Sequence, residues 1–144
     1  VAKFPMDIDL YQSQKAIDNG AAALADGGSL ILVSSCRDGI GDEAYAALLA
    51  QAASPAEAME KIAAGYRLGY HKAAKMAEVS ARAKVRAVTE LSAERLRSMF
   101  IESAASPQEA LDKALEDARA AGIARPAVLV LPDGCVTVPD CGGL

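Results

Sequence analysis

The chain has 144 residues, of which 52% are hydrophobic and 4% are aromatic, and its formal net charge is -4 from 15 basic and 19 acidic side chains. This length fits a single domain with one core over residues 1–144, and the scattered basic residues form no stripe that could neutralise a phosphate backbone, which argues against a nucleic-acid partner. No apolar run approaches the roughly 20 residues of a membrane span and no signal-peptide stretch opens the chain, so we expect a cytoplasmic protein without a membrane partner.

The first predicted helix begins near Asp9 and runs to about Ala25. The Asp9 side chain can accept from the exposed amides of the first turn, and Gln12, three residues later, completes a capping box. A glycine pair then ends the helix, because glycine adopts the left-handed cap conformation at low cost. Residues 29–35 (SLILVSS) form a short continuous apolar run, which predicts a strand covered on both faces in a parallel sheet.

A glycine loop over residues 36–41 (CRDGIG) leads from this strand into a second predicted helix, with Ala44, Leu48 and Leu49 on one face. Two later helices share a start signal at residues 54–57 (SPAE) and 106–109 (SPQE). Each places Ser at the cap, Pro at the first helical position and Glu at the third. We expect the second of these helices to end at a glycine that follows residue 121.

The remaining elements complete an α/β pattern. We expect a helix over 69–83, a strand over 84–91, a short helix over 92–99, a third buried strand over 127–131 (AVLVL) and, after a Pro-Asp-Gly turn, an edge strand over 136–138. Strands separated by helices favour a parallel sheet covered on both faces. The sequence therefore predicts a three-layer α/β/α sandwich with a small, mostly parallel sheet of about three parallel strands plus the C-terminal edge strand.

The densest group of reactive side chains lies in residues 7–15 (DIDLYQSQK). On a helix, Tyr11 and Gln12 converge with Lys15, because they precede it by four and three residues. Such a face can bind a carboxylate or hydroxyl, since lysine offers a mobile positive charge and glutamine both donates and accepts. Unpaired amides at the helix start would also favour an anion. The alternative stays open: Gln12 only closes the capping box, Tyr11 packs with its hydroxyl in water, and Lys15 is a solvated helix residue.

Two further features bear on ligands. The loop with Gly39 and Gly41 follows a strand and precedes a helix, where open parallel sheets place ligands, but it matches no dinucleotide or Walker fingerprint. Its acidic residues would repel phosphate, so we expect the glycines to allow close backbone approach near the site. His71 is the only histidine and lacks a second ligand at metal spacing, so we predict no metal site and a structural place or a domain contact for it.

The cysteines are Cys36, Cys135 and Cys141. Their odd number and wide spacing suit neither a disulfide framework nor a paired zinc motif. We therefore expect free thiols in a reducing compartment.

Four segments, in chain order, resemble the C-terminal domain of the lactate racemase family. They are residues 7–17 (DIDLYQSQKAI), the CRDGIG loop followed by Glu43-Ala44, residues 69–73 (GYHKA) and residues 129–134 (LVLPDG). The first is the most specific. That family carries a nickel pincer nucleotide and interconverts the stereoisomers of a 2-hydroxyacid. The resemblance implies that this chain is the C-terminal domain of a longer two-domain protein, whose N-terminal domain holds the cofactor anchor lysine, the metal-binding histidine and the catalytic histidines.

By the same resemblance, Gln12 and Lys15 match the family's substrate-contacting glutamine and lysine, and Tyr11 contributes to the same wall. Lys15 would neutralise the acid and Gln12 would orient it, while hydride and proton transfers belong to the cofactor and the other domain. No catalytic residue is assigned to this chain, and the isolated domain is not expected to be active. Two other functions stay open: a non-catalytic small-molecule or nucleotide-binding module that uses the Gly39/Gly41 loop, and a protein-interaction domain with an exposed apolar face.

Overall fold

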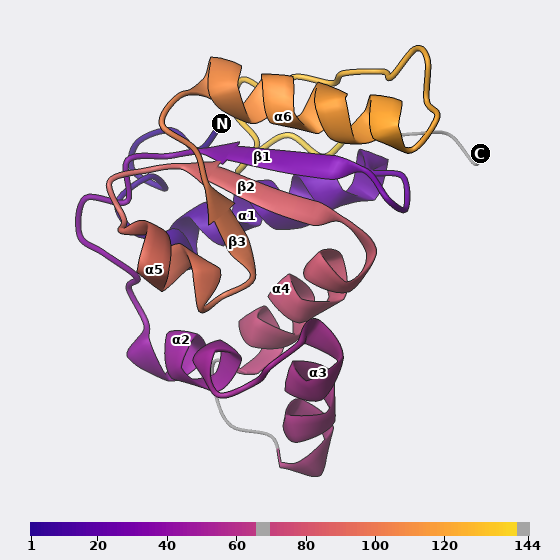
Figure 1. Cartoon of the computed structure of the whole chain (residues 1–144). Coiled ribbons are helices and arrows are strands. Elements are labelled where there is room, and N and C mark those ends of the chain that lie inside the picture. Colours follow the sequence, from indigo (N-terminus) through magenta and orange to yellow (C-terminus); the bar gives the residue numbers. More distant parts are fainter. Residues whose placement is uncertain (66–69, 141–144) are drawn as a thin grey trace.

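A three-stranded parallel sheet forms the centre of the fold (Figure 1). The strands β1 (Ser29–Val33), β2 (Lys84–Val88) and β3 (Ile101–Ser103) lie in the order β1-β2-β3. Leu30 of β1 is opposite Val85 of β2, which in turn is opposite Ile101 of β3. This computed structural model describes residues 1–65 and 70–140.

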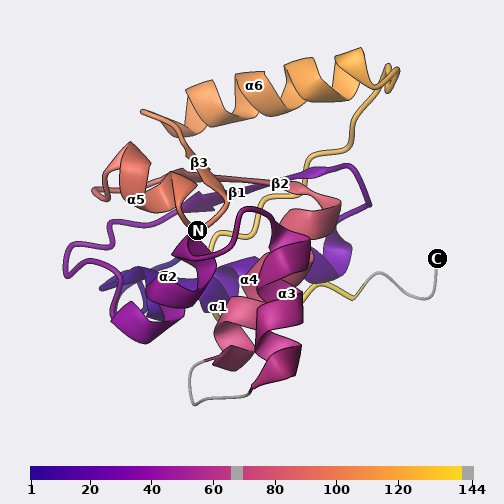
Figure 2. The ribbon, with the colours of Figure 1, turned by 60° about the horizontal axis from the view of Figure 1, so that its bottom comes forward.

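Helices cover both faces of the sheet (Figures 1 and 2). One face carries α1 (Leu10–Gly20), which continues into a short 3-10 turn at Ala21–Ala23, and α4 (Tyr70–Arg82); the other carries α6 (Pro107–Ala120). The helices α2 (Glu43–Ala50) and α3 (Pro55–Ala64) pack against α4, and α5 (Ala93–Arg97) lies between β2 and β3 in the chain. The predicted three-layer α/β/α sandwich is confirmed. Within the described residues, no helix combines the length and apolar character needed to cross a bilayer.

The hydrophobic core lies mainly between the sheet and the layer of α1 and α4. Its fully buried side chains include Leu10 and Ile17 of α1, Leu32 of β1 and Met76 of α4. Across the whole length of α6, by contrast, only Ala110 is buried. The sixth helix is therefore held to the sheet by more than apolar packing.

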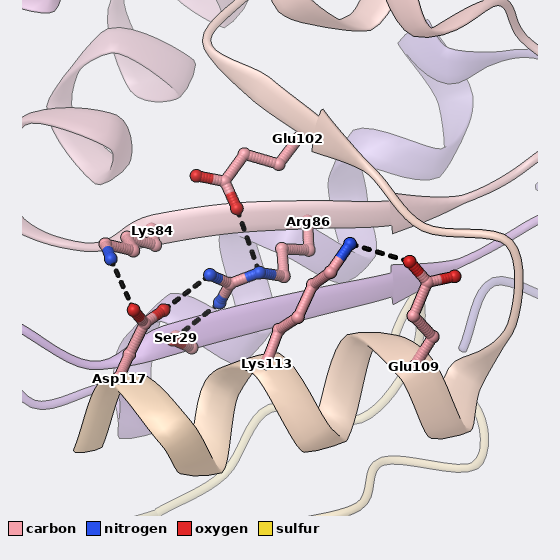
Figure 3. A network of polar contacts seen from close by, with 7 residues as sticks. All are labelled: Ser29, Lys84, Arg86, Glu102, Glu109, Lys113 and Asp117. Atoms are coloured by element: carbon pink, nitrogen blue, oxygen red, sulfur yellow. Dashed lines mark hydrogen bonds and ion pairs between the residues drawn. The ribbon is translucent and has the colours of Figure 1, made fainter. Parts of the chain in front are cut away.

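The additional contact is a network of ion pairs around Arg86 of β2 (Figure 3). The Arg86 Nε lies 2.9 Å from Glu102 Oε2, Nη1 donates to Ser29 Oγ at 3.0 Å, and Nη2 donates to Asp117 of α6. Lys84 Nζ donates to the other Asp117 oxygen at 2.6 Å. Hydrogen bonds from Lys84 and then Arg86 lower the pKa of the Asp117 carboxyl. The network lets β2 carry a charged residue that is only 3% exposed, because each charge there has a partner.

Most predicted elements are present with shorter bounds. Asp9 caps α1, and the serines at 54 and 106 cap α3 and α6 by accepting from the amides of Glu57 and Glu109. On α2, the prediction for Ala44 is wrong: Ala44 is exposed, and Tyr45 lies on the buried face with Leu48 and Leu49. Residue 69 of the predicted 69–83 helix and the tail from residue 141 lie outside the described residues.

The predicted third strand is wrong. Residues 127–131 are not part of the sheet, and Val128, Leu129 and Val130 are 57%, 61% and 68% exposed. The third parallel strand is instead β3, which has three residues and buries only Ile101, so it carries too little pattern to be recognised. Residues 136–138 are not a strand either. An apolar run indicates that a segment can pack against a nonpolar surface. It does not specify whether the segment joins a sheet.

Candidate functional site

The start of α1 is fixed by Asp9 and Gly41. Asp9 Oδ1 accepts from the Gln12 backbone amide at 2.6 Å, as the sequence predicted. The reciprocal bond, from the Gln12 side chain to the Asp9 backbone, is not among the hydrogen bonds of the described residues, so only half of the capping box forms. Gly41 has φ +87°, and a Cβ there would lie 2.5 Å from Asp9 Cγ. The glycine is needed because the capping carboxylate occupies the space of a side chain.

The glycine loop also pairs the first amides of the helix. Leu10 N donates to Gly39 O at 3.1 Å, and Tyr11 N donates to Ile40 O at 2.9 Å. Ser13 N donates to the Asp9 carbonyl at 3.0 Å, so each amide from Leu10 to Ser13 has a partner inside the chain. The expectation that unpaired amides at this helix start would attract an anion is therefore wrong. The neighbouring loop uses them instead.

Lys15 lies on an open part of this helix. Its side chain is exposed, and its Nζ lies 3.5 Å from the Met6 sulfur. Among the described residues it forms no ion pair with a carboxylate. Gln12, one turn earlier, is half-buried, and its side-chain amide has no partner in the same part of the chain. The two residues are three positions apart on α1, the spacing at which helical side chains are neighbours.

Tyr11 is held between two side chains from other helices. Its ring meets the Tyr45 ring edge-on, with centroids 5.9 Å apart and an interplanar angle of 78°. Lys72 Nζ lies 4.3 Å from the centroid of the same ring and also donates to the Tyr11 carbonyl. Tyr45 is fully buried, which raises the pKa of its phenol far above the usual range. The half-buried Tyr11 ring therefore has a defined place beside Gln12 and Lys15.

Comparison with known proteins shows the family of this chain. Residues 2–138 match the family described as the lactate racemase C-terminal domain. The chain belongs to this family. Lactate racemase of Thermoanaerobacterium thermosaccharolyticum is 37% identical over 59 residues, which are 41% of this chain and 14% of that protein. The solved lactate racemase apoprotein of the same organism matches with a TM-score of 0.82 and 30% identity, covering 95% of this chain and 33% of that one. The chain thus spans about a third of the length of that solved relative.

In this lactate racemase C-terminal domain, Lys72 is the residue that sequence reasoning missed. Lys72 lies within the GYHKA segment, and no spacing rule connects it to Tyr11, which is 61 residues away on another helix. Partial burial lowers the pKa of Lys72, with Asp18 opposing the shift and Lys15 adding to it. His71 is exposed on α4. The described residues contain no group of three or more His, Cys, Asp or Glu side chains that could hold a metal ion.

The two described cysteines are free thiols. Cys36 is buried at the start of the glycine loop, with φ +49°, and its sulfur lies 3.4 Å from Ser34 Oγ. Burial raises the pKa of the Cys36 thiol, and it also raises the pKa of the partly buried Cys135 thiol. Both thiols are therefore disfavoured as thiolate nucleophiles at neutral pH.

Proposed function

We propose that this domain forms the substrate side of a nickel-dependent 2-hydroxyacid racemase or epimerase, with Gln12 and Lys15 as substrate-binding residues and Tyr11 as a wall of the same site. One observation carries the proposal. The exposed Lys15 ammonium has no carboxylate partner in the described chain, and it lies one helical turn from Gln12, whose side-chain amide has no hydrogen-bond partner there either. Membership of the lactate racemase C-terminal domain family supports the same reaction class.

The chemistry of these residues fits a 2-hydroxyacid. The substrate carries a carboxylate beside a hydroxyl, and Lys15 can give the carboxylate a charge-assisted hydrogen bond. Gln12 can donate to one oxygen and accept from a hydroxyl, which fixes the orientation of the carbon to be inverted. The Tyr11 ring limits movement on the third side. Holding a reactant in one orientation can contribute several kcal/mol, about 7 or more in favourable cases, to lowering a barrier.

We assign no nickel ligand to this chain, and its described residues contain no group of three or more His, Cys, Asp or Glu side chains placed to hold a metal ion. We propose that the nickel pincer nucleotide, and the groups that move protons, lie in an N-terminal domain of a longer cytoplasmic polypeptide, as the family resemblance implies. In this division of roles, this chain binds and orients the substrate.

An exposed apolar surface supports the proposal that a second domain packs against this one. Val128, Leu129 and Val130 belong to an extended segment that runs from the end of α6 towards α1 (Figure 2). Together with β1 and α6, this segment lines an open cavity of about 690 Å³. A surface of this kind is costly to leave in water and marks an interaction site. We propose that the N-terminal domain covers it.

The loop geometry argues against the alternative of nucleotide binding at Gly39 and Gly41. Backbone amides of the loop already have partners: Cys36 N donates to Asp7 O and Gly39 N donates to Cys36 O, at 2.8 and 2.9 Å. A phosphate needs several free backbone donors directed at one point. With those amides paired and Asp9 filling the space beside Gly41, the loop is a support for α1.

The test is Lys15→Ala in the full-length protein that we propose contains this domain. Loss of one charge-assisted hydrogen bond predicts a fall of about 10-fold to 150-fold in kcat/KM for racemisation of a 2-hydroxyacid. Lys75→Ala, an exposed lysine on α4, is the matched control and should keep wild-type kinetics. Near-normal turnover by a folded Lys15→Ala enzyme would reject the site assignment.

A further inference from the structure

We propose that Lys72 is a positioning residue for the substrate-binding face, because its ammonium holds the Tyr11 ring and adds a second positive charge behind it. The inference rests on the proposed function of Tyr11, Gln12 and Lys15. Lys72 lies on α4, so substrate binding depends on α4 as well as on the three residues of α1.

The first support is a two-way link between α1 and α4. The Lys72 ammonium donates to the backbone carbonyl of Tyr11, and the Gln14 side chain donates from Nε2 to the backbone carbonyl of Lys72 at 2.7 Å. Gln14 is fully buried, so its bond is shielded from competing water. The two bonds fix the first turns of both helices relative to each other, and the Lys72 side chain has little freedom to move away from Tyr11.

The second support is the position of the charge over an aromatic face. Lys72 Nζ lies 4.3 Å from the Tyr11 ring centroid, well within the roughly 6 Å over which the negative face of a ring attracts a cation. The Tyr45 ring meets Tyr11 edge-on as a second contact. The ring is thus held by an ammonium and by a buried ring, and neither contact uses its hydroxyl.

The third support is the charge pattern around Lys72. Its electrostatic neighbours include Asp18 and Asp9, which favour its charged form, and Lys15, which disfavours it. Partial burial is the larger effect and also lowers the pKa of Lys72. A carboxylate that binds to Lys15 would offset the repulsion between the two lysines, since it adds a negative charge beside Lys15. Lys72 would therefore favour an anionic ligand without touching it.

A purely structural role makes a different prediction from a positioning role. If Lys72 only joined α1 to α4, its loss would reduce the fraction of folded enzyme. That reduction lowers the apparent kcat and leaves KM unchanged, since the molecules that stay folded bind substrate normally. A displaced Tyr11 and a missing charge instead weaken substrate binding in the folded molecules.

The experiment compares Lys72→Met, Lys72→Arg and Lys75→Met in the full-length protein, with the folded fraction measured by circular dichroism. Methionine keeps an unbranched apolar stem and removes the charge, whereas arginine keeps a cation that can lie over the ring. For Lys72→Met we expect KM for a 2-hydroxyacid to rise about threefold to thirtyfold. Lys72→Arg should recover most of this loss, and the exposed Lys75→Met should match wild type. An unchanged KM in folded Lys72→Met would overturn the inference.

A second measurement separates this inference from the proposed function. In NMR spectra of the 144-residue chain, the ε-methylene protons of Lys72 should shift upfield and show cross-relaxation with the Tyr11 ring protons. Absence of both signals would overturn the geometry directly. If both are present and the full-length wild type racemises no 2-hydroxyacid, the proposed function fails, and the positioning role falls with it. If the wild type is active and Lys72→Met keeps its KM, only the inference about Lys72 fails.

Discussion

The ion-pair network between β2 and α6 predicts that Asp117→Ala lowers the free energy of unfolding more than Arg86→Met does. Asp117→Ala removes one of the two carboxylate partners of a guanidinium whose side chain is 4% exposed, and it leaves Glu102 beside Nε. The lost bond to Arg86 is worth about 1.5–3 kcal/mol, as for hydrogen bonds to charged groups, and the more exposed bond to Lys84 adds about 0–1 kcal/mol. We therefore expect Asp117→Ala to lower the free energy of unfolding by about 1.5–4 kcal/mol.

Arg86→Met should cost less, although it breaks more contacts. It removes the buried charge itself, and the apolar side chain fills part of the same space. Replacing a buried ion pair by apolar groups is often close to neutral, and the carboxylates left behind, Glu102 and Asp117, are 55% and 32% exposed and can hydrate. We expect a loss of about 0–2 kcal/mol, which is below that of Asp117→Ala.

Urea unfolding of the 144-residue chain, followed by far-UV circular dichroism, measures both values. Thermal unfolding should show a fall of roughly 3–16 °C for Asp117→Ala, at about 2–4 °C per kcal/mol for a domain near this size. Lys113→Ala is the control, because its ion pair with Glu109 is exposed and should contribute little. If Arg86→Met proves more destabilising than Asp117→Ala, the reasoning that an incompletely paired buried guanidinium dominates the energetics is refuted.

Two further predictions concern the elements that support the site. The Tyr45 hydroxyl is buried and has no hydrogen-bond partner among the described residues, so Tyr45→Phe should raise the free energy of unfolding by about 1 kcal/mol in the same urea assay, and a loss of similar size would reveal a hidden partner. Gly41→Ala should lower it by about 2–3 kcal/mol, since it combines backbone strain at φ +87° with displacement of the Asp9 cap. Gly39→Ala isolates the strain, because φ there is +91° but a Cβ would meet no atom within 4 Å; equal losses for the two variants would contradict the proposed contact with Asp9.

Local chemistry explains which parts of the fold could be predicted. The helix starts at Ser54 and Ser106 depend on residues within one turn of each other, and both are present as expected. The strand over 127–131 failed because strand formation needs a partner, which lies far away in sequence and is not encoded in the run itself. Residue 131 pairs instead with the start of the chain, where Val1 N donates to Leu131 O at 2.9 Å. Val128 and Val130 stay exposed.

The same distinction applies to the site. The spacing of Tyr11, Gln12 and Lys15 along one helix is a local property, so the sequence alone could group them. Lys72 reaches Tyr11 from another helix, and the contact depends on how the two helices pack. The expectation of free amides at the start of α1 failed for the same reason, since the carbonyls that pair them come from the loop around Gly39.

The central claim is that the Lys15 face of this domain binds the carboxylate of a 2-hydroxyacid. The most direct measurement compares the affinity of the full-length protein for such an acid and for its neutral primary amide, in wild type and in Lys15→Ala. We predict that the wild type binds the acid at least about tenfold more tightly than the amide, and that Lys15→Ala loses most of this preference. The same preference for the acid in Lys15→Ala would contradict it.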